Sequence, residues 1–174
     1  MNRLFITILF LSFSIRIYSQ EIKFFNQRPV KNLSFGLGGD GGLISLNYEK
    51  LHLISFKLML THEIGVGASQ DYSFLNPNNY YLSFPLNISA CLGRRKHLFE
   101  MGLGSTIYLM LNNNFYSICI YPIIGYRIQP LKDGKIMFKL FATVPYNLNF
   151  DTYINLKDSD ILYLPFGISI GKSF

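Results

Sequence analysis

Residues 162–174 read LYLPFGISIGKSF, and this stretch carries the pattern that decides the fold. Its even positions from Leu162 to Ile170 hold large apolar side chains, while its odd positions hold Tyr, Pro, Gly or Ser. Because successive side chains of a β-strand point to opposite faces, the segment is predicted to be a strand with one apolar face and one small or polar face.

The same alternation recurs upstream, from Asn32 onward. The predicted strands cover residues 33–38, 44–49, 54–66, 82–92, 99–109, 117–128, 136–146 and 162–174. Most are about 11 to 14 residues long, which is enough for a tilted strand to cross a bilayer. The sequence therefore predicts an all-β fold, an eight-stranded antiparallel up-and-down transmembrane β-barrel over residues 32–174.

The predicted connections differ between the two ends of this barrel. Short, basic turns are expected at 50–52, 93–97 and 130–135 on the periplasmic side. The other side has a Gly-Asp-Gly-Gly turn at 39–42, a short connection at 112–114, and longer polar and aromatic loops at 67–79 and 147–160. Short turns at one end and longer loops at the other are typical of outer-membrane barrels.

Composition and the amino terminus agree with export. The 174-residue chain is 49% hydrophobic and only 15% charged, yet no run reaches the roughly 18 to 20 apolar residues of a spanning helix. Residues 1–19 are predicted to be a cleaved signal peptide, with an uncleaved anchor as the alternative, and residues 20–31 a periplasmic segment. Cleavage would remove Arg3 and Arg16 and lower the formal charge from +6 to +4.

Two barrels fit the alternation: a lipocalin-like barrel with the apolar set inside, and a membrane barrel with that set outside. The second face is mostly Gly, Ser, Thr, Asn, Tyr and Pro, which suits a narrow lumen better than a water-exposed surface. Six charged residues share this inward parity and sum to zero: Glu49, Lys57, Glu63, Glu100, Arg127 and Lys139. The sequence predicts that they form a structural network that closes the lumen, with an ion or proton path as the alternative.

Aromatic residues gather near the ends of the predicted strands. Toward the short turns these are Tyr48, Phe99, Tyr126, Phe138 and Phe174, and toward the loops Tyr80, Tyr108, Phe115, Tyr116 and Tyr146. They are predicted to form an interface girdle, although aromatic residues are common in any strand.

Three stretches resemble the small eight-stranded outer-membrane barrel proteins of Bacteroidota, with an architecture similar to the OmpA and OmpX barrels. They are Ser45–Lys50, Tyr121–Arg127 and the terminal strand that ends on Phe174. The resemblance implies residence in the outer membrane of a Gram-negative bacterium, contact with its lipid, and recognition of Ile170 and Phe174 by the barrel-assembly machinery. Lys172 departs from that terminal signal, which normally has an apolar residue there. Most members of this group have no assigned activity.

The sequence predicts a structural role in the envelope rather than a specific activity. The first alternative is a surface binding or adhesion module whose loops 67–79 and 147–160 would contact an extracellular ligand through Tyr72, Phe74, Phe150 and Tyr153. Passage of small solutes, as in a porin, is another.

The remaining alternative is a lipid-modifying outer-membrane enzyme, although we expect that the protein is not an enzyme. His62 is the best anchor for such chemistry, but Glu63 should point to the opposite face of its strand. His52 and His97 are expected in solvated turns. No catalytic residue, cofactor, metal site or nucleic-acid contact is expected, and Cys91 and Cys119 are too few for a disulfide scaffold.

Overall fold

The computed structural model describes residues 29–55, 57–71, 79–111, 116–131, 134–144, 146–148 and 161–174. The predicted signal peptide, most of the segment 20–31 and the greater part of both long loops lie outside these residues. Within the described part, none of the helical structure is both long and apolar enough to cross a membrane.

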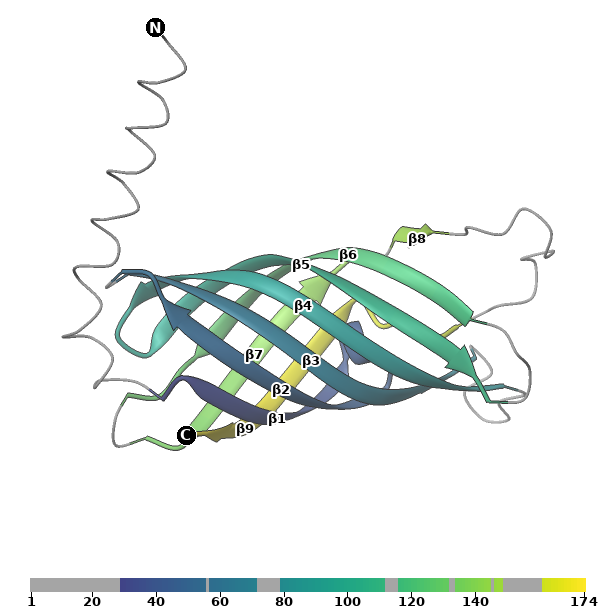
Figure 1. Ribbon diagram of the computed structural model, residues 1–174, viewed down its shortest axis with the longest axis horizontal. Helices are drawn as coiled ribbons and strands as arrows, with labels where there is room; N and C mark the ends of the chain where they lie inside the picture. The colour runs from purple at the N-terminus through teal and green to yellow at the C-terminus, as the bar shows by residue number, and fades with distance from the viewer. Residues whose placement is uncertain are drawn as a thin grey trace, which may run out of the picture.

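The described residues form a closed antiparallel barrel (Figure 1). Its strands are β1 (Lys31–Gly38), β2 (Ile44–Leu53), β3 (Leu58–Gln70), β4 (Tyr80–Arg94), β5 (His97–Met110), β6 (Tyr116–Ile128), β7 (Ile136–Thr143), β8 (Tyr146–Leu148) and β9 (Phe166–Ser173). Because β7 and β8 both pair with β6, one after the other, together they make a single barrel strand. The barrel is therefore eight-stranded, as the sequence predicts, and the pairing of β1 with both β2 and β9 closes it.

The alternation of side chains matches the predicted faces. Leu86, Leu140 and Ile168 are all 45–46% exposed, and the neighbouring positions Asn87, Lys139 and Ser169 are buried. Burial alternates in this way along each of the long strands whose side chains are described. The large apolar set thus faces outward, so the lipocalin-like arrangement is wrong for the described residues.

The first difference from the predicted strands lies at the turn between β2 and β3. β2 continues to Leu53, so the turn falls at 54–57 instead of 50–52. Leu51 and Leu53 keep the inward parity and pack with Met59, Cys91 and Leu98 in a small apolar cluster at this end of the barrel. The sequence pattern therefore ends β2 too early, because Leu51 and Leu53 put apolar side chains at interior positions where the alternation leads one to expect small or polar ones.

The second difference concerns the last strand, which begins at Phe166 rather than at 162. Leu162 is buried, its backbone N–H donates to the carbonyl of Gln70, and its own carbonyl accepts from Ser69 Oγ. Since β3 and β9 are not neighbours in the barrel, residues 161–165 cross the loop-side mouth before β9 begins. We call residues 161–165 the mouth segment.

Candidate functional site

The polar lumen is the candidate site, and adjacent strands supply its charged side chains. Glu49 of β2 lies opposite Glu63 of β3, and Arg127 of β6 lies opposite Lys139 of β7. Glu100 of β5 lies opposite Gly125, which has no side chain to compete for the interior. The inward parity of these five residues brings them together, as the sequence predicts.

Arg127 is the centre of one half of this network and is completely buried. Its Nη1 and Nη2 donate to the two carboxylate oxygens of Glu49 at 2.6 and 2.5 Å. Its Nε donates to Glu100 Oε2 at 2.9 Å. The planar guanidinium therefore engages Glu49 with two hydrogen bonds and still reaches a second carboxylate, a geometry that lysine could not reproduce.

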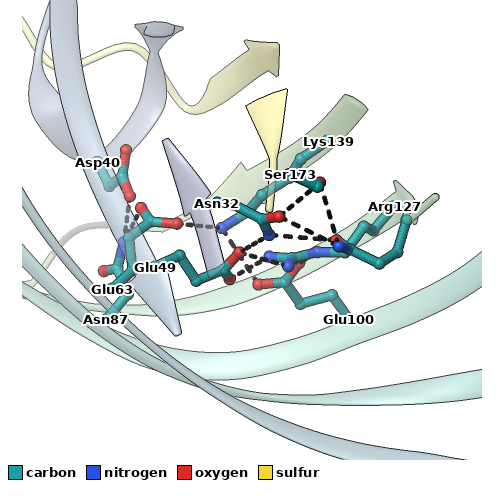
Figure 2. Close-up of polar contacts among 10 residues, drawn as sticks. Asn32, Asp40, Glu49, Glu63, Asn87, Glu100, Arg127, Lys139 and Ser173 are labelled. Carbon is teal, nitrogen blue, oxygen red and sulfur yellow. Dashed lines mark hydrogen bonds and ion pairs between the residues drawn. The ribbon is translucent and has the colours of Figure 1, made fainter. Parts of the chain in front are cut away.

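Lys139 continues the network toward the loop side (Figure 2). Its Nζ lies 3.1 Å from Glu100 Oε1 and 3.4 Å from Glu63 Oε2, and it sits 4.8 Å from the centre of the Phe141 ring. Glu100 thus bridges the two cations, with one oxygen facing each of them.

Asp40 joins the network from a place that the sequence pattern does not predict. It lies in η3 (Gly39–Gly41), the tight turn between β1 and β2, and it is only 1% exposed. Asn87 Nδ2 donates to its carboxylate and, at 3.0 Å, to Glu63 Oε1. Gly39 and Gly42 adopt φ values of +71° and +88°, which glycine reaches without strain, and this allows the turn to fold back into the barrel.

The inward turn is held by its backbone as well as by Asp40. Thr106 Oγ1 donates to the carbonyl oxygen of Asp40 at 2.6 Å, and Ser83 Oγ donates to that of Gly41 at 2.5 Å. Gly104, between Asn87 and Tyr121 in the register, leaves room for them, because a methyl group there would overlap both side chains. The turn is therefore a plug bound to β4 and β5, which we call the β1–β2 plug.

Three neutral residues complete the network at the turn end. Asn32 donates from Nδ2 to Glu49 Oε2 at 2.6 Å and accepts from Ser173 Oγ at 2.6 Å. Gln129 exchanges hydrogen bonds with Asn32 at 3.1 and 3.2 Å. The inward parity of their strands includes Asn32, Gln129 and Ser173. The alternation could therefore have identified them as lumen residues, whereas a search for charged residues could not.

Lys57 does not belong to the lumen, which corrects the prediction. It is exposed, in the turn at 54–57, because β3 begins only at Leu58. With Lys57 outside and Asp40 inside, the described lumen holds four carboxyl groups, those of Asp40, Glu49, Glu63 and Glu100, against the two cations Arg127 and Lys139. The lumen network is therefore not neutral, and formally it has two more carboxylates than cations.

Apolar clusters lie on both sides of the charged residues. At the turn end stands the cluster around Leu51, Met59 and Leu98. Toward the loops lies a larger, aromatic cluster, made by Tyr81, Tyr108, Cys119, Tyr121, Ile123 and Phe141. Tyr108 is therefore an interior residue and not part of an interface girdle, which corrects that prediction. Ile161 and Tyr163 of the mouth segment pack against the aromatic cluster, and Tyr163 OH donates to Thr143 Oγ1 at 2.7 Å. In the described part of the chain, the charged residues of the lumen thus lie between two apolar clusters.

The histidines lie on the outside of the barrel. His62 Nδ1 is 3.2 Å from His52 Nε2, and the two exposed rings stack with centroids 5.0 Å apart. Glu63 is buried in the lumen, so the two neighbours point to opposite faces, as the strand parity predicts. His97 contacts the hydroxyl of Tyr126 through Nδ1. Within the described residues, no group of three or more His, Cys, Asp or Glu side chains is placed to hold a metal ion.

The remaining predicted positions fall into three groups. Ile170 and Phe174 are both 55% exposed on the outer face, and Phe174 exchanges backbone hydrogen bonds with Lys31. Cys91 and Cys119 are both buried. The predicted loop contacts, Tyr72, Phe74, Phe150 and Tyr153, lie outside the described residues.

In comparisons with protein-family models, curated proteins and solved structures, the chain matches none of them.

Proposed function

We propose that this chain is an outer-membrane β-barrel with a closed polar lumen and a structural role in the envelope. The observation that carries the proposal is the inversion of the usual burial pattern. Leu33, Phe35 and Leu37 of β1 are 45–52% exposed while Glu49, Glu100 and Arg127 are completely buried. A surface of this kind matches hydrocarbon, because each exposed apolar side chain would cost free energy in water.

The proposed location follows from this surface and from the predicted signal peptide. In hydrocarbon, backbone polar groups need internal partners, and a closed barrel leaves no strand edge unpaired. The two apolar clusters and the β1–β2 plug support a lumen that does not conduct. The proposal includes no catalytic step, since every acidic side chain among the described residues is buried, on the other side of the barrel wall from His62.

Reconstitution tests the proposal directly. The refolded chain should insert into neutral phosphatidylcholine vesicles, migrate differently on gels before and after heating, and fractionate with the outer membrane of the cells that produce it. In planar bilayers it should give no steady conductance. A chain that folds only in water, or that forms a persistent open pore, would contradict the proposal.

A surface binding module is the second candidate, and one contact favours it. Asp71 forms a backbone bridge with Ile161, and its carboxylate accepts from the N–H of Asn79 at 3.2 Å. The bridge brings the bases of the predicted loops 67–79 and 147–160 together at one point of the rim. Two loops rich in aromatic and polar residues would then present a joint surface, as binding loops on rigid scaffolds do.

Loop replacement tests this second candidate. In the variant, residues 73–77 and 150–158 are exchanged for short Gly-Ser linkers, which leaves the Asp71–Ile161 bridge in place. If the loops bind surface saccharides, the parent protein binds members of a glycan array and the variant does not, with heat-modifiable mobility unchanged in both. A parent that binds no glycan on the array contradicts a saccharide-binding role.

A further inference from the structure

The acidic side chains that the structure describes are all buried, whereas most of the basic ones are exposed on the outside of the barrel. The acidic residues among the described side chains are Asp40, Glu49, Glu63, Asp71 and Glu100, and all of them are buried. The exposed charged residues of the same part of the chain are Lys31, Lys50, Lys57, Arg95, Lys96, Lys135 and Lys172. The outer surface that the structure describes thus has positive side chains and no exposed Asp or Glu side chain beside them.

The strand bounds place all of these basic residues at the turn end of the barrel. This is the end that holds the carboxyl terminus (Figure 1). Lys31 of β1 is the register partner of Lys50 of β2, and Lys172 of β9 pairs with positions on both β1 and β7. Lys57 and Lys96 lie in the turns, where their carbonyl groups accept from the backbone of Gly93 and Gln129. We call the seven residues the basic collar, because they follow the rim from β9 through β1 and β2 to the β4–β5 turn and the start of β7.

The basic collar borders the outward apolar band. Tyr48 and Lys50 point outward from the same face of β2, and Phe174 follows Lys172 at the end of β9 with the same parity. Phe99 and Tyr126, a register pair of β5 and β6, are also exposed near this end. Aromatic rings followed by long basic side chains match the boundary between hydrocarbon and headgroups, where lysine stems lie along apolar surface and the ammonium group reaches polar surroundings.

Several like charges on one rim repel one another unless anions lie between them. In the described part of the chain the Asp and Glu side chains are buried, so none of them lies between the lysines of the collar. Headgroup phosphates would supply the missing charge in the same plane as the collar, at the depth set by the aromatic rings.

We propose that the basic collar binds the phosphate groups of anionic phospholipids in the leaflet that surrounds the turn end. This inference rests on the proposed membrane function and adds to it a lipid preference and a fixed depth for the barrel. It also gives a reason for the departure at Lys172, where the terminal strand has a lysine in place of an apolar residue.

The test compares a neutral variant with a charge-retaining control. The variant carries Lys31→Gln, Lys50→Gln, Lys135→Gln and Lys172→Gln, and the control carries Arg at the same four positions. Each protein is reconstituted in phosphatidylcholine vesicles that contain spin-labelled phosphatidylglycerol or spin-labelled phosphatidylcholine, and the protein-bound fraction of each labelled lipid is measured. The parent and the Arg control should prefer phosphatidylglycerol by about fivefold, and high salt should reduce the preference.

The outcomes separate this inference from the proposed function. A parent protein that fails to insert into pure phosphatidylcholine overturns the membrane proposal itself. If the parent inserts but shows no preference for phosphatidylglycerol, the lipid inference is overturned. This is the result expected if the collar binds an acidic soluble protein instead of lipid. An undiminished preference in the Gln variant also overturns it, as does loss of preference in the Arg control.

Discussion

Asn87, in the middle of β4, donates a hydrogen bond to the carboxylate of Asp40, which lies 47 residues earlier in the chain and belongs to a turn. The same amide donates to Glu63 Oε1, so a single side chain connects the β1–β2 plug to the lumen network. The turn is thereby part of the interior of the barrel rather than part of its rim.

Substitution of Asp40 should therefore loosen the plug. Asp40→Ala removes the acceptor for Asn87 and is expected to lower the free energy of unfolding by about 1.5 to 3 kcal/mol, the usual contribution of a hydrogen bond to a charged group. Asp40→Asn, the matched control, keeps an acceptor and should cost less. Urea unfolding in detergent micelles measures both, and equal costs would mean that Asp40 does not hold the plug.

Arg127 should be the most sensitive position of the lumen. Arg127→Met keeps much of the volume but leaves Glu49 and Glu100 without their shared cation, which is expected to cost about 3 to 5 kcal/mol. The double variant Glu49→Gln/Arg127→Met removes one of the stranded charges and should recover part of this loss. Unfolding of the single and double variants in the same micelles provides the comparison. Unchanged stability of Arg127→Met would show that the residue is solvated.

Glu63 and Glu100 should respond in opposite directions to the same substitution. Glu100→Gln removes the carboxylate that lies between both cations and is expected to destabilise the barrel. Glu63→Gln lowers the excess of negative charge near Asp40 and keeps an acceptor oxygen for Asn87, while it weakens the 3.4 Å contact with Lys139, so stability should be unchanged or higher. Thermal unfolding at neutral pH measures the two variants side by side. A larger loss for Glu63→Gln than for Glu100→Gln would contradict the charge distribution described here.

A cation on the outer face, midway along the barrel, should destabilise the protein in lipid. Leu86→Arg is expected to cost about 2 to 4 kcal/mol in lipid, whereas Leu111→Arg, beyond the end of β5, should cost less than about 1 kcal/mol. Equilibrium folding into phosphatidylcholine vesicles distinguishes the two positions. Equal, small costs at both would argue against hydrocarbon around Leu86.

The reactivity of the two cysteines should show whether water reaches the interior of the barrel. Cys91 and Cys119 are 0% and 2% exposed, so neither thiol should react with a water-soluble maleimide until the barrel unfolds. A positive control is Ser55→Cys in the β2–β3 turn, in a background where both native cysteines are replaced by serine. Mass spectrometry gives the labelled fraction. Rapid labelling of Cys91 in the folded protein would show that the turn-end cluster admits water.

The period-2 alternation was sufficient to predict the eight strands and the outward set, because every second side chain of a strand must share a face. It also placed Glu49, Glu63, Glu100, Arg127 and Lys139 inside, as the structure has them. It could not give the end of β2, because Leu51 and Leu53 put apolar side chains at inward positions and so break the alternation. It also could not give the start of β9, because Leu162 is an interior residue that shares the parity of the outer face.

Turns obey no such period, and both errors in the lumen arise from them. The sequence pattern places Lys57 in a strand that starts one residue later in the structure, and it gives no sign that the turn of Asp40 folds inward. Whether a Gly-Asp-Gly-Gly turn extends outward or folds back depends on Asn87, Thr106 and Ser83, which come from other strands. Such long-range partners are not visible in the local sequence.

The pairing of β1 with β9 has a consequence for biogenesis. Asn32 and Ser173, 141 residues apart, meet where β1 pairs with β9, so the barrel cannot close before the chain has been synthesised through Ser173. Until then the open edges of the sheet expose unpaired amide and carbonyl groups, which can form hydrogen bonds with other chains. A chain truncated before Phe166 should therefore aggregate instead of folding into a smaller barrel.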